Sequence, residues 1–337
     1  MAHSVSLSAS LRGVLKLLKC FALYLLIRAT ADSRPSLTGI LTGCMIGLAL
    51  VAGDGVWQVV TGQDLFYHRQ PDYALDGQVE RALATFHHPA SFAIHLATFA
   101  PLLCAWGLLG PRRWRAPCLG ACGVVAAAVL LARSRGGLLA FLCALVVLAW
   151  WLRRWTPLLV ALITAGVQAA TVPPAVKAWA TTMPTLLEQL TQPDRLSYWQ
   201  AAINMVSAHP FLGVGINTFV KAYPFYRVAG DPFAEIGPYA HNQYLHLAAE
   251  LGWPGLAVFV VLVALVLLAV RRRLAARAAA PYEAFVSAGL GAGLVGYLVD
   301  GLFESSLFYA RGSITFWFLV GLIMATDALG SRAAPPP

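Results

Sequence analysis

The sequence predicts an all-α polytopic membrane protein with eight or nine transmembrane helices and one long helical loop outside the membrane. Three observations lead to this class. Hydrophobic residues make up 59% of the 337 positions, charged residues make up only 12%, and the mean hydropathy is +0.68. A soluble domain of this length could not bury so much apolar surface, so most of the chain should lie in lipid.

The apolar segments are long enough to span a bilayer, whose core of about 30 Å requires roughly 20 apolar residues per helix. Eight segments meet this requirement: 36–53, 89–110, 117–133, 137–152, 156–172, 243–270, 283–302 and 312–330. The basic, amphipathic stretch Leu11–Ile27 is a ninth candidate that either spans the membrane or lies on its inner surface. Arg12, Lys16 and Lys19 favour an N-terminus on the cytoplasmic side, whereas strict alternation of the spans places residue 1 outside. No cleavable signal peptide is predicted, because no small-residue cleavage site follows this stretch.

The arginines predict which connections face the cytoplasm. They cluster on alternate connections between spans, at Arg112, Arg113, Arg115, Arg153, Arg154, Arg271, Arg272, Arg273 and Arg277. The positive-inside rule assigns these connections to the cytoplasm. The outward connections are then 54–88, the turn at 134–137, 173–241 and 303–311. This topology explains the net charge of +9 without a nucleic-acid partner, and membrane lipids are the expected surroundings.

Five consecutive segments are expected from this pattern. They are an N-terminal amphipathic or transmembrane segment (1–35), transmembrane helices with an outer loop at 54–88 (36–172), an outer loop domain (173–241), three C-terminal transmembrane helices (242–330) and a cytoplasmic tail (331–337). The six cysteines lie in or beside apolar runs without metal-ligand spacing, so neither disulfides nor a metal centre are expected. Acidic residues in the 54–88 loop, among them Asp54 and Asp64, could contact a polar substrate on the outer side of the membrane.

The segment 173–241 is the candidate site, because about 70 structured-looking residues outside the membrane are uncommon without a function. Apolar residues recur at helical spacing at Leu196, Trp199, Ile203 and Val206. Pro210 should end that helix. A glycine turn at Gly213–Gly215 and a second short helix through Phe219 and Tyr223 follow. The next span is about 28 residues long, or roughly 42 Å, so it should project above the hydrocarbon or bend at Gly252–Gly255.

Three motifs occur in a fixed order along the chain. They are a serine-arginine-glycine turn in Leu131–Leu139, the pair Asp194–Trp199 and His209–Gly215, and His241-Asn242 followed by Gly252-Trp-Pro-Gly-Leu256. In order, spacing and topology these motifs resemble the O-antigen ligase and Wzy-type O-antigen polymerase superfamily. The resemblance covers roughly residues 85–325.

This resemblance implies a GT-C-type, metal-independent, inverting glycosyltransferase of the bacterial inner membrane with its active site facing the periplasm, and no cofactor. It would move a glycan from a polyprenyl (undecaprenyl) diphosphate carrier to an acceptor hydroxyl. O-antigen ligation to the lipid A core is the first choice of reaction. A growing polysaccharide repeat (polymerase) and a protein Ser or Thr (O-oligosaccharyltransferase) remain open as acceptors.

The motif match assigns roles to three residues. His241 is the expected general base, because a neutral imidazole can take a proton from an attacking sugar hydroxyl. Arg135 and Arg195 are the expected diphosphate ligands, because guanidinium groups are permanently charged, fork-shaped donors. Ordinary alternatives exist for each: a lipid-headgroup anchor for Arg135, a solvated first-turn residue for Arg195 and a helix cap for His241.

Four further residues could support these three. Arg133 is a less favoured alternative to Arg135 as a diphosphate ligand. Asn242, His246 and Glu250 lie on one stripe of a helix and could orient His241. An ordinary alternative for the stripe is a polar face packed on the loop. A lipid-linked glycan transporter is the rival of another class, but it should show internal repeats and paired charges at the bilayer midplane, and the sequence shows neither. A passive scaffold would not explain arginines and a histidine on one side.

Overall fold

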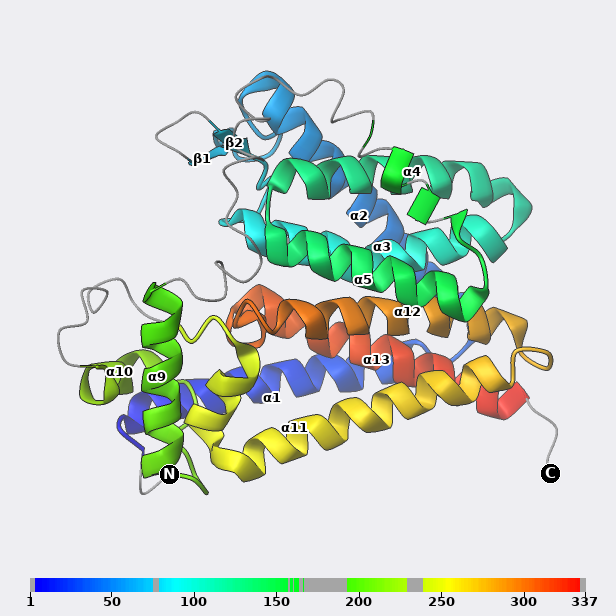
Figure 1. Cartoon of the computed structure of the whole chain (residues 1–337). Helices are drawn as coiled ribbons and strands as arrows, with labels where there is room; N and C mark the ends of the chain where they lie inside the picture. Colours follow the sequence, from blue (N-terminus) through cyan, green and yellow to red (C-terminus); the bar gives the residue numbers. More distant parts are fainter. Residues whose placement is uncertain are drawn as a thin grey trace. The chain divides into compact units, whose positions relative to one another are not determined.

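The computed structural model of the chain describes residues 4–74, 79–156, 158–159, 161–163, 166, 193–228 and 239–333. The chain divides into two compact units, which we describe separately. The loop unit consists of Met1–Leu25, Pro184–Val266 and Gly301–Phe318. The helical unit consists of Leu26–Met183, Leu267–Asp300 and Leu319–Pro337. Figure 1 labels the helices and strands of both units.

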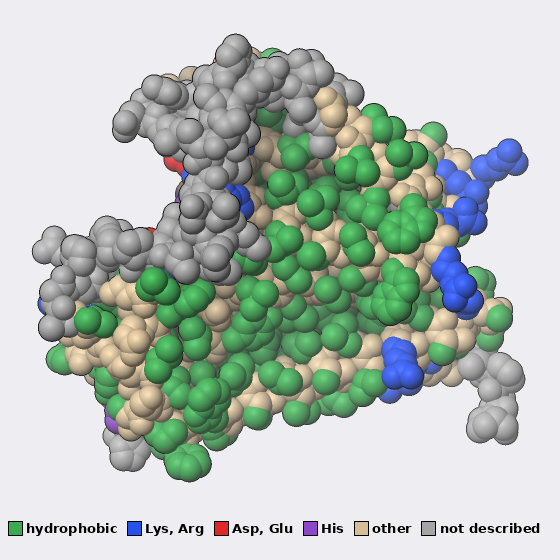
Figure 2. Space-filling view, viewed as in Figure 1, with side chains coloured by type: hydrophobic (Ala, Val, Ile, Leu, Met, Phe, Trp, Pro, Cys, Tyr) green, Lys and Arg blue, Asp and Glu red, His purple; other side chains and the backbone are tan. Residues whose placement is uncertain are grey.

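Seven helices in the described part of the chain are long and apolar enough to cross a membrane, which confirms the all-α polytopic class. They are α2 (Arg34–Thr61), α3 (Pro89–Leu109), α4 (Arg112–Ala132), α5 (Arg135–Leu152), α11 (Gln243–Ala275), α12 (Pro281–Asp300) and α13 (Ala310–Ala333). Each coincides with a predicted span. The predicted span 156–172 lies largely outside the described residues. The N-terminal candidate forms one continuous helix, α1 (Leu7–Thr30). Figure 2 shows hydrophobic side chains over much of the visible helical surface.

In the helical unit, α3 packs against α4, α5 and α12. Glycines on α12 allow the close approach: a Cβ added at Gly289 would lie 2.7 Å from the Cα of Leu102, and one at Gly293 would lie 1.9 Å from the carbonyl oxygen of Thr98. These glycines are four residues apart and therefore share one face of the helix. Small residues at such spacing are typical of helix contacts in membranes, where close backbone packing replaces the hydrophobic effect.

The basic residues that predicted the topology lie at helix ends of the helical unit, at the start of α4, the end of α5 and the end of α11. Figure 2 shows Lys and Arg side chains gathered at the right-hand edge of the view. Two of these arginines are paired. Arg272 and Arg273 lie 2.8 Å and 3.0 Å from the carboxylate of Asp327, which ties the end of α11 to α13.

The connection between α2 and α3 contains a small hairpin, β1 (Asp72–Ala74) and β2 (Val79–Arg81), paired antiparallel. The expectation that Asp54 and Asp64 could contact an acceptor is wrong. Both are buried, and their carboxylates accept backbone N–H groups within the loop: Asp54 from Leu65, and Asp64 from Phe66, Tyr67 and Arg69. These carboxylates hold the loop backbone in place because buried polar groups need partners.

The loop unit contains α9 (Pro193–Ala208) and α10 (Phe219–Tyr226), which confirms both helices expected in the outer segment. The expected apolar face of α9 is wrong in part, because Leu196 and Ile203 are exposed. The core is formed instead by a neighbouring face of α9 together with α10 and α11. Its members are Tyr198, Ala201, Ala202, Met205, Val206, Val214, Phe219, Ala222, Tyr223, Ala240, Ala248 and Ala249.

The start of α1 is bound to the loop between α9 and α10. The backbone N–H of Val5 donates to the carbonyl oxygen of Val214 at 3.1 Å. The hydroxyl of Ser10 donates to the carbonyl oxygen of Ile216 at 3.1 Å. The side-chain amide of Asn217 donates in turn to the carbonyl oxygen of Ala9. The N-terminal end of α1 therefore lies beside the 193–228 segment.

Candidate active site

Three ionisable side chains from distant parts of the sequence meet in the loop unit. The Nδ1 atom of His241 lies 3.1 Å from Oε2 of Glu304, and the Nη2 atom of Arg195 lies 3.9 Å from Oε1 of the same carboxylate. Arg195 comes from the first turn of α9, His241 directly precedes α11, and Glu304 follows α12. Two of the three predicted site residues are thus brought together, with a carboxylate between them that the sequence analysis did not assign.

Each member of this cluster has a distinct environment. The side chain of Arg195 is 11% exposed, and its Nη1 atom is buried with no hydrogen-bond partner among the described residues. The side chain of His241 is 30% exposed, and its ring lies 5.9 Å from that of Tyr198. A buried guanidinium with an unused N–H is costly unless an anion binds there. The cluster can therefore offer a donor to an anion beside a partly exposed imidazole.

The connection that follows α12 is held against the start of α11, and this contact places Glu304. The buried side chain of Gln243 accepts the backbone N–H of Leu307 at 3.1 Å, while its own backbone N–H donates to the carbonyl oxygen of Gly301 at 2.7 Å. The Nδ1 atom of His246 lies 3.1 Å from the hydroxyl of Ser305. These three contacts flank Glu304 and hold its backbone next to His241.

Asn242 caps α11. Its side-chain oxygen accepts the backbone N–H groups of Tyr244 and Leu245 at 3.1 Å and 3.0 Å, which satisfies two donors that a helix start leaves free. His241 precedes this cap in the left-handed conformation, with φ 44°. A non-glycine residue at positive φ is uncommon and marks a backbone that its surroundings hold in place. The imidazole is therefore presented by a fixed turn and not by a mobile loop.

His246 and Glu250 lie one turn apart on α11 and are both buried. The ring of His246 stacks on Phe308 with 3.6 Å between centroids, and its Nε2 atom lies 3.4 Å from Glu250. The carboxylate of Glu250 accepts the backbone N–H groups of Asn217 at 2.5 Å and Phe219 at 2.8 Å, at the start of α10. Both residues hold α10 and the 301–309 connection onto α11 without contacting the cluster directly.

Two sequence motifs pack on each other at a break in α11. Gly252 has φ 69° and ψ −178°, so the helix bends there, as its length predicted. The backbone N–H of Trp253 donates to the carbonyl oxygen of Pro210, and that of Val214 to Ala249. A Cβ at Gly252 would lie 2.5 Å from the carbonyl carbon of Phe211. The glycine is needed for both its conformation and its lack of a side chain.

Replacing Gly252 with alanine should therefore destabilise the loop unit. We expect a loss of about 2 kcal/mol or more, because the backbone conformation is strained for any residue with a Cβ and the added methyl meets backbone atoms. The apparent melting temperature of the purified protein in detergent would measure it. Gly47→Ala in α2 is the matched control, since nothing lies within 4 Å of a Cβ there. Equal melting temperatures for the two variants would contradict this account of the bend.

Arg135 and Arg133 lie in the helical unit, at the turn between α4 and α5. Arg133 ends α4 in the left-handed conformation, and Ser134 caps α5 by accepting the backbone N–H of Gly137 at 3.3 Å. Arg135 is the first residue of α5, and both arginines are partly buried. A Cβ at Gly137 would lie 2.4 Å from that of Ala93, so this turn is closely packed on α3. The serine-arginine-glycine motif is thus a helix start that presents Arg135.

The surroundings of the carboxylate are aromatic. Tyr309 follows the short 3-10 helix η1 (Ser306–Phe308), and its ring lies tilted against that of Tyr239, with 4.9 Å between ring centroids. Burial and the charge of Glu304 raise the pKa of Tyr309 above its ordinary value. Its hydroxyl therefore stays protonated at neutral pH.

Among the described residues, no group of three or more His, Cys, Asp or Glu side chains is arranged to hold a metal ion.

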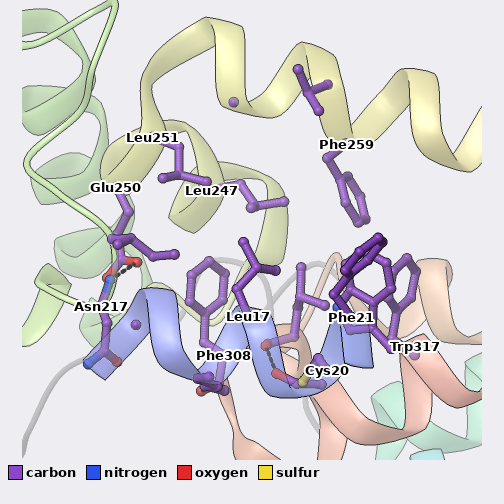
Figure 3. Close-up of a pocket in the computed structure, with 18 of the residues that line it drawn as sticks. Leu17, Cys20, Phe21, Asn217, Leu247, Glu250, Leu251, Phe259, Phe308 and Trp317 are labelled. Carbon is purple, nitrogen blue, oxygen red and sulfur yellow. Dashed lines mark hydrogen bonds between the residues drawn. The ribbon is translucent and has the colours of Figure 1, made fainter. Parts of the chain in front are cut away.

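The loop unit also contains a cavity of about 370 Å³ with almost entirely apolar walls. Figure 3 shows side chains of α1, α11 and the 307–317 segment around it, among them Leu17, Cys20, Phe21, Leu247, Leu251, Phe259, Phe308 and Trp317. Lys16 also lines it, and its ammonium donates to the carbonyl oxygen of Phe308. The cavity can hold an apolar chain and has one cation in its wall.

The sequence does not indicate that Glu304, Gln243 and Ser305 contribute to this cluster. Glu304 is 63 residues from His241, so no local spacing connects them. One signal was present in the sequence: the connections expected to face outward contain both a glutamate and a histidine, and a histidine base needs a partner that orients its ring. In a histidine that acts as a base, the N–H of the other ring nitrogen usually donates a hydrogen bond to a carboxylate or carbonyl oxygen.

The fold and the cluster define a class: a multi-pass helical membrane protein with a histidine, a carboxylate and an arginine assembled outside its spans. Residues 120–260 match the family model for O-antigen ligase, which confirms the resemblance to the O-antigen ligase and Wzy superfamily. The matched segment contains Arg135, Arg195 and His241. No curated protein shows significant similarity to the chain. The family supports O-antigen ligase-type glycan transfer by a glycosyltransferase-like enzyme in a membrane.

Proposed function

We propose that this protein transfers a glycan from an undecaprenyl-type polyprenyl diphosphate to an acceptor hydroxyl at the periplasmic face of the bacterial inner membrane. The lipid A core is the proposed acceptor, which makes the reaction O-antigen ligation. The observation that carries the proposal is the meeting of Arg195, Glu304 and His241 in the loop unit. It combines a base with a phosphate-binding donor, which are the two groups that this transfer requires.

His241 is the proposed general base. As the acceptor oxygen attacks the anomeric carbon of the sugar, its proton passes to the imidazole, and the bond from that carbon to the diphosphate oxygen breaks. The polyprenyl diphosphate leaves with the electron pair. A single displacement of this kind inverts the anomeric centre. An imidazole that is partly exposed and held at a fixed turn is suited to this step, because general bases must be within hydrogen-bond reach of the proton they accept.

Arg195 and Arg135 are the proposed ligands of the diphosphate. Negative charge grows on the leaving oxygen as the bond breaks, and preorganised cations stabilise it most in a site shielded from water. The buried, unpartnered Nη1 atom of Arg195 supports its role. Arg135 is the first residue of α5, and the dipole at a helix N-terminus also favours an anion. Two guanidinium groups would supply the positive charge without a metal, and Arg133 is a proposed neighbour of this part of the site.

Asn242, His246 and Glu250 are proposed to support catalysis through the backbone. Asn242 fixes the helix start after His241, and the other two hold the adjoining segments in place. The apolar cavity of the loop unit offers a place for the isoprenoid tail of the donor. Burial of such a chain would stabilise binding by about 25 cal/mol per Å² of apolar surface removed from water.

A deletion strain would test this proposal through its surface glycans. For a ligase we expect loss of capped lipopolysaccharide together with accumulation of long carrier-linked chains. Accumulation of single carrier-linked repeat units would instead indicate a polymerase, and altered glycoprotein bands an O-oligosaccharyltransferase. Unchanged surface glycans and unchanged carrier-linked intermediates would refute glycan transfer of every kind.

A further inference from the structure

We propose that Glu304 is a positioning residue that fixes the tautomer of His241 and so makes its Nε2 atom the one that accepts the proton. This inference rests on the proposed function, since it assumes that His241 is the base. Glu304 would set the tautomer of the base before substrate binds.

The hydrogen position follows from the chemistry of the two groups. An ionised carboxylate only accepts hydrogen bonds, so the Nδ1 atom of His241, 3.1 Å from Oε2 of Glu304, must carry a hydrogen. A neutral imidazole has a single N–H. The Nε2 atom is then the free lone pair, and it has no hydrogen-bond partner among the described residues. The carboxylate therefore selects the form of the ring that can act as a base.

Glu304 is fixed well enough to make this selection. Its neighbours on both sides are bound to α11 through Gln243 and His246, and its side chain is 18% exposed. Its second oxygen, Oε1, faces the Nη2 atom of Arg195 at 3.9 Å. Arg195 can only donate, so each oxygen of the carboxylate faces a donor. Oε1 therefore faces the guanidinium of Arg195, and Oε2 orients the ring of His241.

This arrangement predicts an unusual order of variants. In Glu304→Gln, the amide oxygen should turn to the Arg195 donor, which leaves the amide NH₂ facing Nδ1 of His241. Because an NH₂ group only donates, Nδ1 would have to accept and the ring hydrogen would move to Nε2. The nitrogen facing the acceptor would then be unable to take a proton. In Glu304→Ala, Nδ1 can donate to water and the productive tautomer survives.

The test measures transfer from a lipid-linked donor by purified variants. We expect Glu304→Gln to lose about 10²–10⁴-fold in kcat, as a general base does when it is lost or held in the wrong tautomer. Glu304→Ala should lose less than Glu304→Gln, and Glu304→Asp should restore part of the rate. A purely structural role predicts the opposite order, because glutamine keeps the shape of the side chain and alanine does not. That opposite order would overturn the proposal.

A nitrogen NMR measurement of the ring supplies a second readout that a structural role would not move. The two ring nitrogens of a neutral histidine have different chemical shifts depending on which of them carries the hydrogen. We expect the hydrogen of His241 on Nδ1 in the unsubstituted protein and on Nε2 in Glu304→Gln. A hydrogen on Nε2 in the unsubstituted protein would contradict the pairing with Glu304.

Two controls separate this inference from the proposed function. Leu302→Ala changes an exposed side chain in the same connection and should leave transfer unchanged. If His241→Ala transfers glycan at the normal rate, the proposed function fails. If His241→Ala is inactive but Glu304→Gln transfers normally, only the role of Glu304 is wrong.

Discussion

Replacing His241 with alanine should reduce glycan transfer by about 10²–10⁴-fold, the usual contribution of a general base. The amount of protein in the membrane should stay normal, because the side chain is 30% exposed and contributes little to the core of the loop unit. Transfer of glycan from a lipid-linked donor to lipid A core, measured with purified protein in nanodiscs, would give the rate.

Two further variants make this result specific. His241→Asn keeps a side chain that tolerates the left-handed conformation at φ 44°, so its loss of activity could not be attributed to a changed turn. His68→Ala removes an exposed histidine of the helical unit and should leave the rate unchanged. Normal transfer by both His241 variants would show that another group accepts the proton.

Replacing Arg195 with lysine should lower kcat by about 10²–10³-fold, the usual effect of removing one preorganised donor to a developing anion. The charge is kept, but a compact ammonium cannot both reach Glu304 and present a second N–H to the diphosphate. We expect kcat to fall more than KM rises, because the leaving group carries most charge in the transition state. Steady-state kinetics with a lipid-linked donor would separate the two parameters.

Arg135→Lys should fail in the same way if the turn before α5 also binds the diphosphate. Arg227→Lys is the control, because this arginine of the loop unit is exposed at the end of α10. A rate for Arg195→Lys equal to that of the control would mean that a diffuse positive charge is sufficient, and a bidentate role would be excluded.

The spans and the bend in α11 could be predicted because their causes are local. A bilayer requires a fixed length of apolar residues, so α2, α3 and α12 follow from composition alone. The break at Gly252 follows from an excess of length and a glycine-proline sequence. The two helices of the outer segment follow from apolar spacing and from Pro210, which ends α9. These features depend on residues that are neighbours in the sequence.

The missing features depend on residues that are distant in the sequence. The pairing of His241 with Glu304 requires the connection after α12 to fold onto the start of α11, which Gln243 and Ser305 bring about. The buried face of α9 was misjudged because Leu196 and Ile203 are apolar but exposed, and periodicity alone cannot separate a face toward a core from one toward lipid or solvent. Spacing predicts which residues share a face but not what covers it.

The loop unit draws on the beginning, the middle and the late part of the chain, since Val5 pairs with Val214 and Gln243 pairs with Gly301. A ribosome delivers these parts in sequence, so the unit has no complete set of partners until translation passes the connection after α12. A nascent chain interrupted after α11 would carry the imidazole and the guanidinium but no carboxylate between them. The proposed catalytic cluster can therefore be completed only after α12 and the connection that follows it have been made.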